Sequence, residues 1–314
     1  MDFDFFESKL EEVRNEYGMG GIACAVTDCD KILFAKGFGV TSVEKPWDEV
    51  RPDTLFRIAS NTKFTVALSL MRLFEDGLID LDAPLSRYIP WFDLSRSITI
   101  RKIFSHTAGL PNEYTPDGPL DEDGFEASVR DELCNIKLVH NPEDEVFLYS
   151  NWGYRLAGIV LSRVTGMLPS EAVREFVLKP LKMEHSMFDI KEAITYQVAI
   201  PHSKGPVVNH YMPVNANRFS TGGLFSNVED MTALARVILN EGAPLIKKET
   251  FDMMRTNYAK HIEGINKGYG FGIMEREYGG LLAYGHTGAN PPYRSCIFAF
   301  PEKDIAVAFT LNTD

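Results

Sequence analysis

The sequence of 314 residues lacks the features that would mark a membrane, secreted or nucleic-acid-binding protein. No uncharged apolar run approaches the roughly 18 residues that span a bilayer. The acidic start Met1–Glu7 is unlike the basic beginning of a signal peptide. The net charge of −12, from 32 basic and 44 acidic side chains, disfavours binding to nucleic acid or to an anionic membrane. We therefore expect a cytoplasmic protein that binds neither.

Cysteine patterns and metal-ligand patterns are also missing. The four cysteines form no C-x-x-C pair and no dense framework, which indicates neither a zinc site nor a disulfide scaffold. The seven histidines show no spacing typical of a metal site, and no phosphate-binding loop is present. We expect no cofactor.

The patterns that are present place strands near both termini and helices between them. Hydrophobic residues make up 45% of the chain and charged residues 24%, as is typical of a globular protein. Alternation predicts strands at Gly21–Thr27, Ile32–Phe38, Leu281–Tyr284, Ser295–Phe300 and Ile305–Leu311. Helical spacing is found at residues 3–17, Phe64–Asp76, Ile100–Ser105, Phe125–Cys134, Trp152–Val164, Pro169–Val177 and Val228–Leu239.

These patterns predict an α/β fold of the α+β type, with one antiparallel sheet built from both chain ends and flanked by helices. Residues 1–95 and 255–314 are expected to form the sheet lobe, and residues 96–254 a mainly helical lobe inserted between them. Loops with Pro and Gly at 111–124 and 200–218 separate some of the helices. A ligand site is expected in the cleft between the lobes.

Ser60 and Lys63 form a Ser-x-x-Lys motif at the start of a predicted helix. Their spacing puts both side chains on one helix face. A lysine whose pKa is lowered by burial can take the serine proton, and the helix N-terminus favours the developing alkoxide. The alternative is an N-cap serine followed by a surface lysine. Ser42 and Lys45 have the same spacing, but Pro46 follows them, and we expect a loop there.

Tyr149 and Asn151 form the chain's only Tyr-x-Asn sequence. A phenol beside an ammonium group can lose its proton more easily and pass it to a leaving group. Asn151 could bind a substrate carbonyl and orient Lys63. The alternative is an ordinary helix start that is capped by Ser150 or Asn151.

His286–Gly288 lies on a predicted strand near the end of the chain. A strand beside a cleft offers backbone groups to an extended substrate, and Gly288 would allow close approach. The amides of Ala289 and Ser60 could together donate to an oxyanion. The alternative is a structural histidine that is hydrogen-bonded within its strand.

The order and spacing of these three motifs resemble the serine β-lactamase and penicillin-binding protein superfamily. The resemblance is greatest to the branch of class C β-lactamases, D-Ala-D-Ala carboxypeptidases, D-aminopeptidases and related esterases, and it covers residues from about 20 to 312. Further stretches that carry it are Phe56–Ser60, Gly77–Asp82, Ser105–Pro111, Thr221–Ser226 and Gly268–Gly272.

The resemblance implies that Ser60 forms an acyl-enzyme and that Lys63 and Tyr149 share the proton transfers. It also implies a substrate-binding set and an oxyanion hole. The substrate-binding residues would be Asn151, His286, Thr287 and Gly288, and the oxyanion hole would consist of the amides of Ser60 and Ala289. His106 lies in a structural motif of the family, and we do not expect it to act as a base.

Three departures from the family pattern affect these expectations. The third motif begins with His286 where typical β-lactamases have lysine, a change that the family associates with peptidases and esterases. A histidine attracts a carboxylate only when protonated, so such binding is expected to weaken as the pH rises through about 6.5. Pro291 and Pro292 stand where a Gly-rich stretch is common, and they stiffen the turn. The sequence stops after a strand where the family has a C-terminal helix, and we expect either that the chain was trimmed or that a separate segment or a second copy covers the sheet.

The leading hypothesis is a serine hydrolase that acts through an acyl-enzyme on peptide, amide or ester bonds of a small-molecule substrate. The alternatives are a β-lactamase or penicillin-binding D-Ala-D-Ala carboxypeptidase and, from another class, a catalytically silent binding or assembly protein. The presence of Ser60, Lys63 and Tyr149 together favours an enzyme.

Overall fold

The computed structural model describes residues 2–112, 122–203, 207–208, 218–260, 262 and 266–313. The loops predicted at 111–124 and 200–218 lie largely outside the described residues. Within the described ranges, no helix has both the length and the apolar character needed to cross a membrane.

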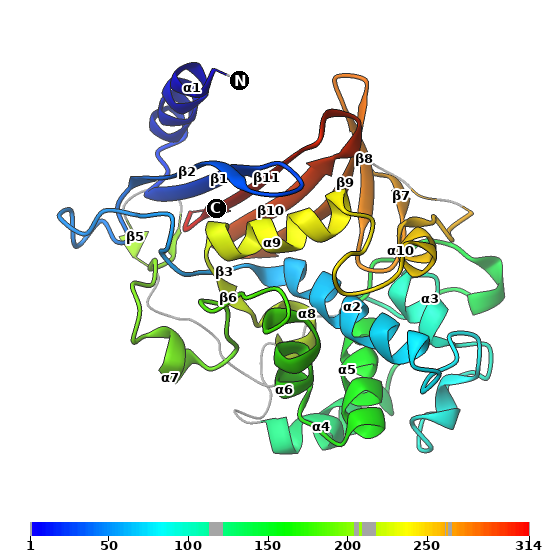
Figure 1. Cartoon of the computed structure of the whole chain (residues 1–314). Helices are drawn as coiled ribbons and strands as arrows, with labels where there is room; N and C mark the ends of the chain where they lie inside the picture. The colour runs from blue at the N-terminus through cyan, green and yellow to red at the C-terminus, as the bar shows by residue number, and fades with distance from the viewer. Residues whose placement is uncertain are drawn as a thin grey trace.

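A seven-stranded antiparallel sheet takes its strands from both ends of the chain (Figure 1). β1, near the N-terminus, pairs with β11, near the C-terminus, and Ala25 lies opposite Ala308. This pairing confirms the predicted sheet. The spatial order is β2 (Ile32–Gly39), β1 (Gly21–Thr27), β11 (Ile305–Leu311), β10 (Tyr293–Phe300), β9 (Leu281–Asn290), β8 (Met274–Tyr278) and β7 (Asn266–Tyr269).

Helices lie on both faces of this sheet. α9 (Val228–Leu239) packs against β1, β10 and β11, where small side chains such as Ala25 and Ala308 are fully buried and let the helix approach closely. On the opposite face, α1 (Phe3–Glu16) stacks Phe3 on Phe34 of β2, with ring centroids 5.2 Å apart. Figure 1 shows α9 below the sheet and α1 above it. α9 falls in the range 96–254 but covers the sheet.

The remaining predicted helices are present, with small shifts at their ends. A π-helical turn, Arg174–Leu178, follows α6, where an unbroken helix was predicted to Val177. These helices are α2 (Thr62–Glu75), α3 (Ile100–Phe104), α4 (Phe125–Leu133), α5 (Asn151–Thr165) and α6 (Pro169–Val173). Three further helices were not predicted, namely α7 (Ile190–Ala193), α8 (Phe219–Gly222) and α10 (Lys248–Arg255). Two short antiparallel pairs complete the fold, β3 (Phe56–Arg57) with β6 (Phe225–Ser226) and β4 (His202–Ser203) with β5 (Val207–Val208).

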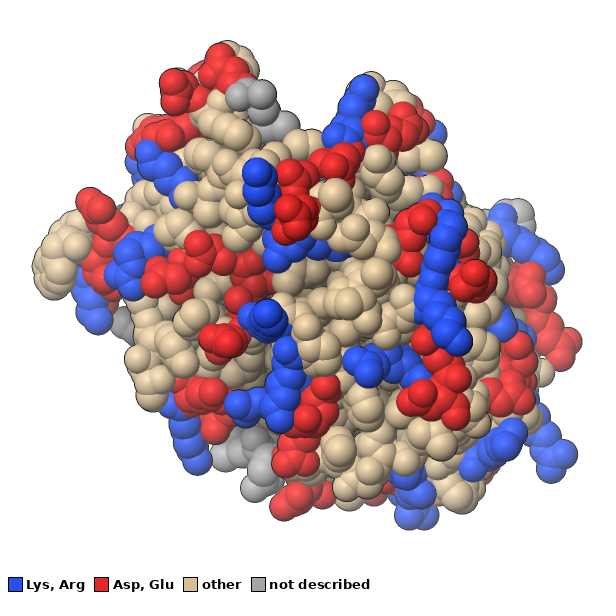
Figure 2. All heavy atoms as spheres, in the orientation of Figure 1, with Lys and Arg blue, Asp and Glu red and all other residues tan. Residues whose placement is uncertain are grey.

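Charged side chains of both signs are interspersed over the face of the molecule in Figure 2. That face carries no continuous basic patch of the kind that binds nucleic acid.

Candidate active site

Ser60 lies in a 3₁₀ turn, residues 59–61, directly before α2. Its neighbour Ala59 has a φ of 48°, a left-handed conformation that is uncommon for a residue with a Cβ. Such conformations persist only where the surrounding structure holds them, and they cluster at functional sites. The side chain of Ser60 is directed to Lys63 and makes no capping bond, so the N-cap alternative does not apply.

Contacts from β10 hold this turn in place. Ser295 Oγ donates to the carbonyl oxygen of Ile58 at 2.6 Å and accepts from Asn61 Nδ2 at 2.8 Å. Two groups on either side of Ser60 are therefore bonded to one side chain of the sheet. This arrangement fixes the serine relative to β9 and β10.

Lys63 is fully buried, and its Nζ lies within hydrogen-bond distance of three oxygen atoms. These are Ser60 Oγ at 3.0 Å, Asn151 Oδ1 at 2.8 Å and the carbonyl oxygen of Thr221 at 2.8 Å. Burial, together with the charge of Arg155, holds the pKa of Lys63 well below its usual range. The site therefore favours the neutral amine.

The geometry around Lys63 also determines where the lone pair of a neutral amine must point. A neutral amine has two N–H groups and one lone pair, whereas the oxygens of Asn151 and Thr221 can only accept. Those two oxygens take both N–H groups. The lone pair is left for the third neighbour, the hydroxyl of Ser60.

Tyr149 is hydrogen-bonded to Ser60, and its ring centroid lies 5.0 Å from Lys63 Nζ. Burial raises its pKa, with the Ser60 hydrogen bond acting weakly in the other direction. The phenol therefore keeps its proton at neutral pH. This corrects the expectation that an ammonium group lowers its pKa, because burial dominates at this position and also favours the uncharged form of Lys63.

Asn151 begins α5 and points away from its own helix terminus. Its Oδ1 accepts from Lys63, and its Nδ2 donates to Asn112 Oδ1 at 3.1 Å. Ser150, at the N-cap position, donates its hydroxyl to the carbonyl of Pro111 at 2.7 Å and does not cap the helix. The predicted orientation of Lys63 by Asn151 is therefore present.

Strand β9 has a free edge beside the Ser60 turn. The pairing between β8 and β9 ends at Met274 opposite Gly285, while β10 continues alongside β9 as far as Asn290. Among the described strands, none pairs with residues 286–290 on the β8 side. Thr287 is half-buried on this stretch. An open strand edge of this kind can pair with an extended substrate.

Gly288 allows β9 to approach the Ser60 turn closely. A Cβ at this position would lie 2.2 Å from the carbonyl oxygen of Ile58 and 2.3 Å from Ser295 Oγ. The sequence predicted that Gly288 leaves room for a substrate. The structure shows that the room is occupied by the backbone that precedes Ser60.

His286 is buried, with 2% of its surface exposed. Its Nδ1 lies 2.5 Å from the carbonyl oxygen of Thr287, and its Nε2 lies 2.9 Å from the hydroxyl of Tyr269. Burial and, to a lesser extent, the charge of Lys63 lower the pKa of His286 to about 3. The expectation that it titrates near pH 6.5 and attracts a carboxylate is therefore wrong, and the structural-histidine alternative describes what is seen.

Some residues of this centre received no role from the sequence. Thr221 contributes a backbone carbonyl, which no side-chain pattern can reveal, and Asn112 and Tyr269 belong to no motif with a known spacing. Thr221 and Tyr269 do lie in two of the stretches that carried the family resemblance. His106 is fully engaged in hydrogen bonds and burial holds its pKa well below its usual range, in line with its expected structural role.

The second Ser-x-x-Lys sequence forms a turn and no site. The backbone amide of Lys45 donates to the carbonyl of Ser42 at 2.9 Å, and Ser42 Oγ accepts from the amide of Glu44 at 3.2 Å. This agrees with the predicted loop. Only Ser60 has a helix behind it that places a lysine one turn away.

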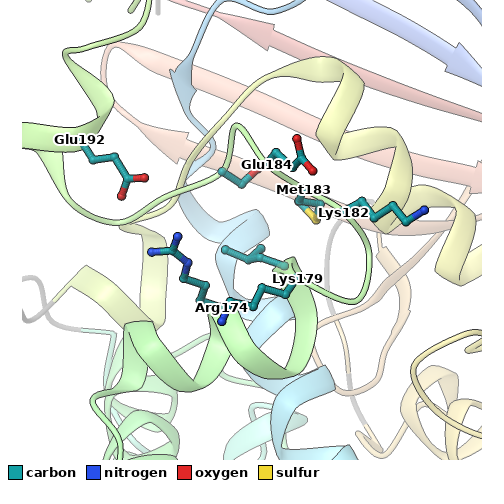
Figure 3. Close-up of a pocket in the computed structure, with 8 residues that line it drawn as sticks. Arg174, Lys179, Lys182, Met183, Glu184 and Glu192 are labelled. Carbon is teal, nitrogen blue, oxygen red and sulfur yellow. The ribbon is translucent and has the colours of Figure 1, made fainter.

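A hollow of about 230 Å³ lies apart from Ser60, beside the π-helical turn (Figure 3). Arg174 and Glu192 point toward one another across it. The one hydroxyl among the residues that line it, that of Ser186, is bonded to Ser226 and Asp230 at 2.8 Å, and neither of these partners is a lysine or a histidine. Across the described ranges, no His, Cys, Asp and Glu side chains gather in a group that could hold a metal ion.

Residues 6–314 match the family described as Beta-lactamase. The chain belongs to this family. Penicillin-binding protein 4 of Amycolatopsis lactamdurans is 26% identical over 341 residues, which cover 99% of this chain and 86% of that protein. Protein flp of Staphylococcus aureus (strain MW2) is 29% identical over 174 residues, which cover 54% of this chain. The match covers only 34% of protein flp, about a third of its length.

Two solved structures of this beta-lactamase family fold are similar over almost the whole chain. An octameric penicillin-binding protein homologue from Pyrococcus abyssi has a TM-score of 0.86 and 27% identity, covering 100% of this chain and 74% of that chain. D-amino acid amidase from Ochrobactrum anthropi SV3 has a TM-score of 0.84 and 22% identity, covering 99% of this chain and 91% of that chain. The second likeness concerns the fold alone.

Proposed function

We propose that this beta-lactamase family member is a serine hydrolase that cleaves amide or ester bonds through an acyl-enzyme on Ser60. The observation that carries the proposal is the set of three contacts at Lys63. Asn151 and Thr221 accept the two N–H groups of the neutral amine and leave its lone pair for the serine proton. No capping or packing role requires this arrangement.

The proton transfers follow from the same contacts. Lys63 takes the proton of Ser60 as the serine oxygen attacks the substrate carbonyl. The ammonium group that results has three N–H groups and three oxygen acceptors within reach, so no N–H group is left without a partner. Tyr149, which holds its own proton beside Ser60, delivers it to the leaving nitrogen or oxygen and regains one from Lys63.

The substrate is proposed to lie along the free edge of β9. Thr287 is half-buried there, and Asn151 faces the same centre. The backbone amides of Ser60 and Ala289 are proposed to bind the oxyanion. The close approach of β9 to the turn before Ser60 supports this placement, because it puts the two backbone segments next to each other.

The chemistry of the third motif favours substrates without a free carboxylate next to the scissile bond. His286 is neutral and buried, so it supplies no fixed positive charge of the kind that a lysine would supply. Peptide, amide or ester substrates are therefore proposed over β-lactams. The alternative is β-lactamase or D-Ala-D-Ala carboxypeptidase activity, because one of the relatives is named a penicillin-binding protein.

One substrate panel tests this proposal. Purified wild-type protein and Ser60→Ala should be assayed side by side on p-nitrophenyl esters, D- and L-aminoacyl amides, longer peptides and nitrocefin. We expect turnover of an ester or amide by the wild type, loss of several orders of magnitude in Ser60→Ala, and little nitrocefin hydrolysis. Nitrocefin turnover equal to the best ester or amide would favour the β-lactamase alternative. Turnover of none would favour the catalytically silent alternative.

Two further expectations stay predictions. Fractionation of cells would test the cytoplasmic location, and light scattering of the purified chain would test self-association.

A further inference from the structure

A continuous set of buried hydrogen bonds joins the Tyr149 loop to strand β9 through Tyr269. The backbone N–H of Ser150 donates to His106 Nδ1 at 3.1 Å. His106 Nε2 lies 3.2 Å from the hydroxyl oxygen of Tyr269, which lies 2.9 Å from His286 Nε2. His286 Nδ1 then lies 2.5 Å from the carbonyl oxygen of Thr287.

The donor and the acceptor of every hydrogen bond in this series follow from the groups at its two ends. The amide of Ser150 can only donate, so His106 Nδ1 is unprotonated and the neutral ring carries its proton on Nε2. The carbonyl of Thr287 can only accept, so His286 carries its proton on Nδ1 and accepts at Nε2. The hydroxyl of Tyr269 therefore accepts from His106 and donates to His286, and no other direction satisfies all four bonds.

Tyr269 is the one residue that connects the two histidines. It is fully buried, on β7, 163 residues from His106 and 17 residues from His286. The neighbouring hydroxyl of Tyr154 donates its proton to the carbonyl of Phe104 at 3.2 Å and is also hydrogen-bonded to Tyr269. Its proton is therefore not available to His286.

The chain of bonds also encloses the ring of Tyr149. That ring packs on His106 with centroids 4.3 Å apart, and it lies 6.3 Å from Tyr269 and 6.2 Å from His286. The backbone amide at the start of this series of hydrogen bonds belongs to Ser150, the residue that follows Tyr149. The position of the Tyr149 hydroxyl relative to β9 is therefore set by groups that Tyr269 holds together.

We propose that Tyr269 is a positioning residue for the hydrolysis proposed above, on which this inference rests. Its hydroxyl, bonded at once to His106 and His286, fixes the separation between the Tyr149 hydroxyl and the substrate edge of β9. It acts on the substrate edge of β9 through the side chain of His286. Without it, one N–H donor on His106 and one acceptor on His286 are left buried and unpaired, and both segments must rearrange.

The test compares Tyr269→Phe with Tyr293→Phe. Tyr293 is buried on β10, and its hydroxyl donates to the carbonyl of Ala199 at 2.5 Å, so the control also removes one buried hydroxyl bond. Kinetics should be measured at a temperature where both variants are folded. Misplacement of a catalytic group by a fraction of an ångström to an ångström costs about 10- to 100-fold in rate. We expect a loss of that size in kcat for Tyr269→Phe, with KM changed less than kcat, and no loss beyond about twofold for Tyr293→Phe.

A second measurement reads the proton positions without any substrate. Two-bond ¹H–¹⁵N correlation spectra of the imidazole rings distinguish the tautomers, and His106→Gln and His286→Gln assign the signals. We expect His106 protonated on Nε2 and His286 on Nδ1 in the wild type and in Tyr293→Phe, and a changed His286 signal in Tyr269→Phe.

Two results would overturn the inference: a kcat for Tyr269→Phe equal to that of Tyr293→Phe, or the opposite tautomer on either histidine. These outcomes are separate from failure of the proposed function. If Ser60→Ala keeps full activity, the proposed function fails while the spectra still report on the hydrogen-bonded chain.

Discussion

The oxygen atoms around Lys63 support the proposal that this side chain and Tyr149 take part in a single proton transfer. In the proposed mechanism Lys63 receives the proton of Ser60 and Tyr149 returns one to the leaving group, so neither step is useful without the other. Substitutions of residues that act as one unit give losses that do not add.

We therefore predict that Lys63→Met and Tyr149→Phe each lower kcat/KM by about 10³-fold or more, and that the double variant is little worse than the poorer single variant. Lys9→Met, at an exposed lysine of α1, serves as the control and should retain full activity. Steady-state kinetics on the best ester or amide provide the measurement. Losses that multiply in the double variant would show that the two residues act independently.

His286 offers a second test at the scale of one residue. Since its pKa is lowered to about 3, its charge does not change across the physiological range. Two substrates that differ only in a free carboxylate should then show pH profiles of kcat/KM with the same shape between about pH 5 and 8. Affinity for the carboxylate substrate alone that rises as the pH falls would contradict the neutral assignment.

The sequence identified the side chains that meet at the candidate site but not their protonation states. Ser60, Lys63 and Tyr149 were recognised from spacing and resemblance, and the structure brings them together. Burial then reversed two electrostatic expectations, because the pKa values of Tyr149 and His286 depend on elements far away in the chain. Spacing along a sequence carries no information about such desolvation.

At the scale of elements, β9 requires a glycine at position 288 to approach the turn before Ser60. Its neighbours on the turn before Ser60 are a backbone carbonyl and the clamping hydroxyl of Ser295, neither of which can move without shifting the turn.

Gly288→Ala is predicted to destabilise the protein by about 1–3 kcal/mol, as overpacking generally does, and to lower kcat by about 100-fold. Chemical denaturation and kcat at a temperature where the variant is folded give the two numbers. Gly285→Ala is the matched control, because its Cβ would meet the backbone of Ile297 on the same strand pair. Full activity in a folded Gly288→Ala variant, or an equal loss of kcat per folded molecule in Gly285→Ala, would contradict this requirement.

Element boundaries were predicted well where one face of a helix or strand is buried. β11 and α9 were predicted with the bounds that the structure shows, since their periodicity is regular. β7, β8 and the π-helical turn were not predicted. Arg174–Leu178 has the same spacing as an ordinary helix, and β7 has a register shift between Asn266 and Gly268 that interrupts its alternation.

For the whole molecule, the buried neutral histidines link stability to pH. The pKa of His286 is lowered to about 3 and that of His106 well below its usual range, so the folded state binds no proton there. The unfolded chain binds protons at both positions below about pH 6.5. The free energy of unfolding therefore falls as the pH drops from about 6.5 toward 3.

His286→Gln removes one of these sites. It should reduce the slope of the unfolding free energy against pH by about 1.4 kcal/mol per pH unit in that window. Urea denaturation at several pH values measures the slope in the variant and in the wild type. An unchanged slope in a folded variant would mean that His286 is already protonated in the folded protein.

Chain topology could be predicted at this scale because strands at both termini must pair with something. One antiparallel sheet built from the two ends was the simplest assembly, and β1 pairs with β11 as expected. The contacts that complete the site could not be predicted in the same way. Thr221 and Lys63 are 158 residues apart, and their contact depends on where α8 is packed against α2.

The central claim is that Ser60 is the nucleophile of an acyl-enzyme. Its most direct test is reaction of the wild-type protein with a fluorophosphonate, followed by digestion and mapping of the modified peptide by mass spectrometry. We predict one modified residue, Ser60, and no modification of Ser60→Ala. Label on Ser42 or on another residue, or no label on the active wild-type protein, would contradict the claim.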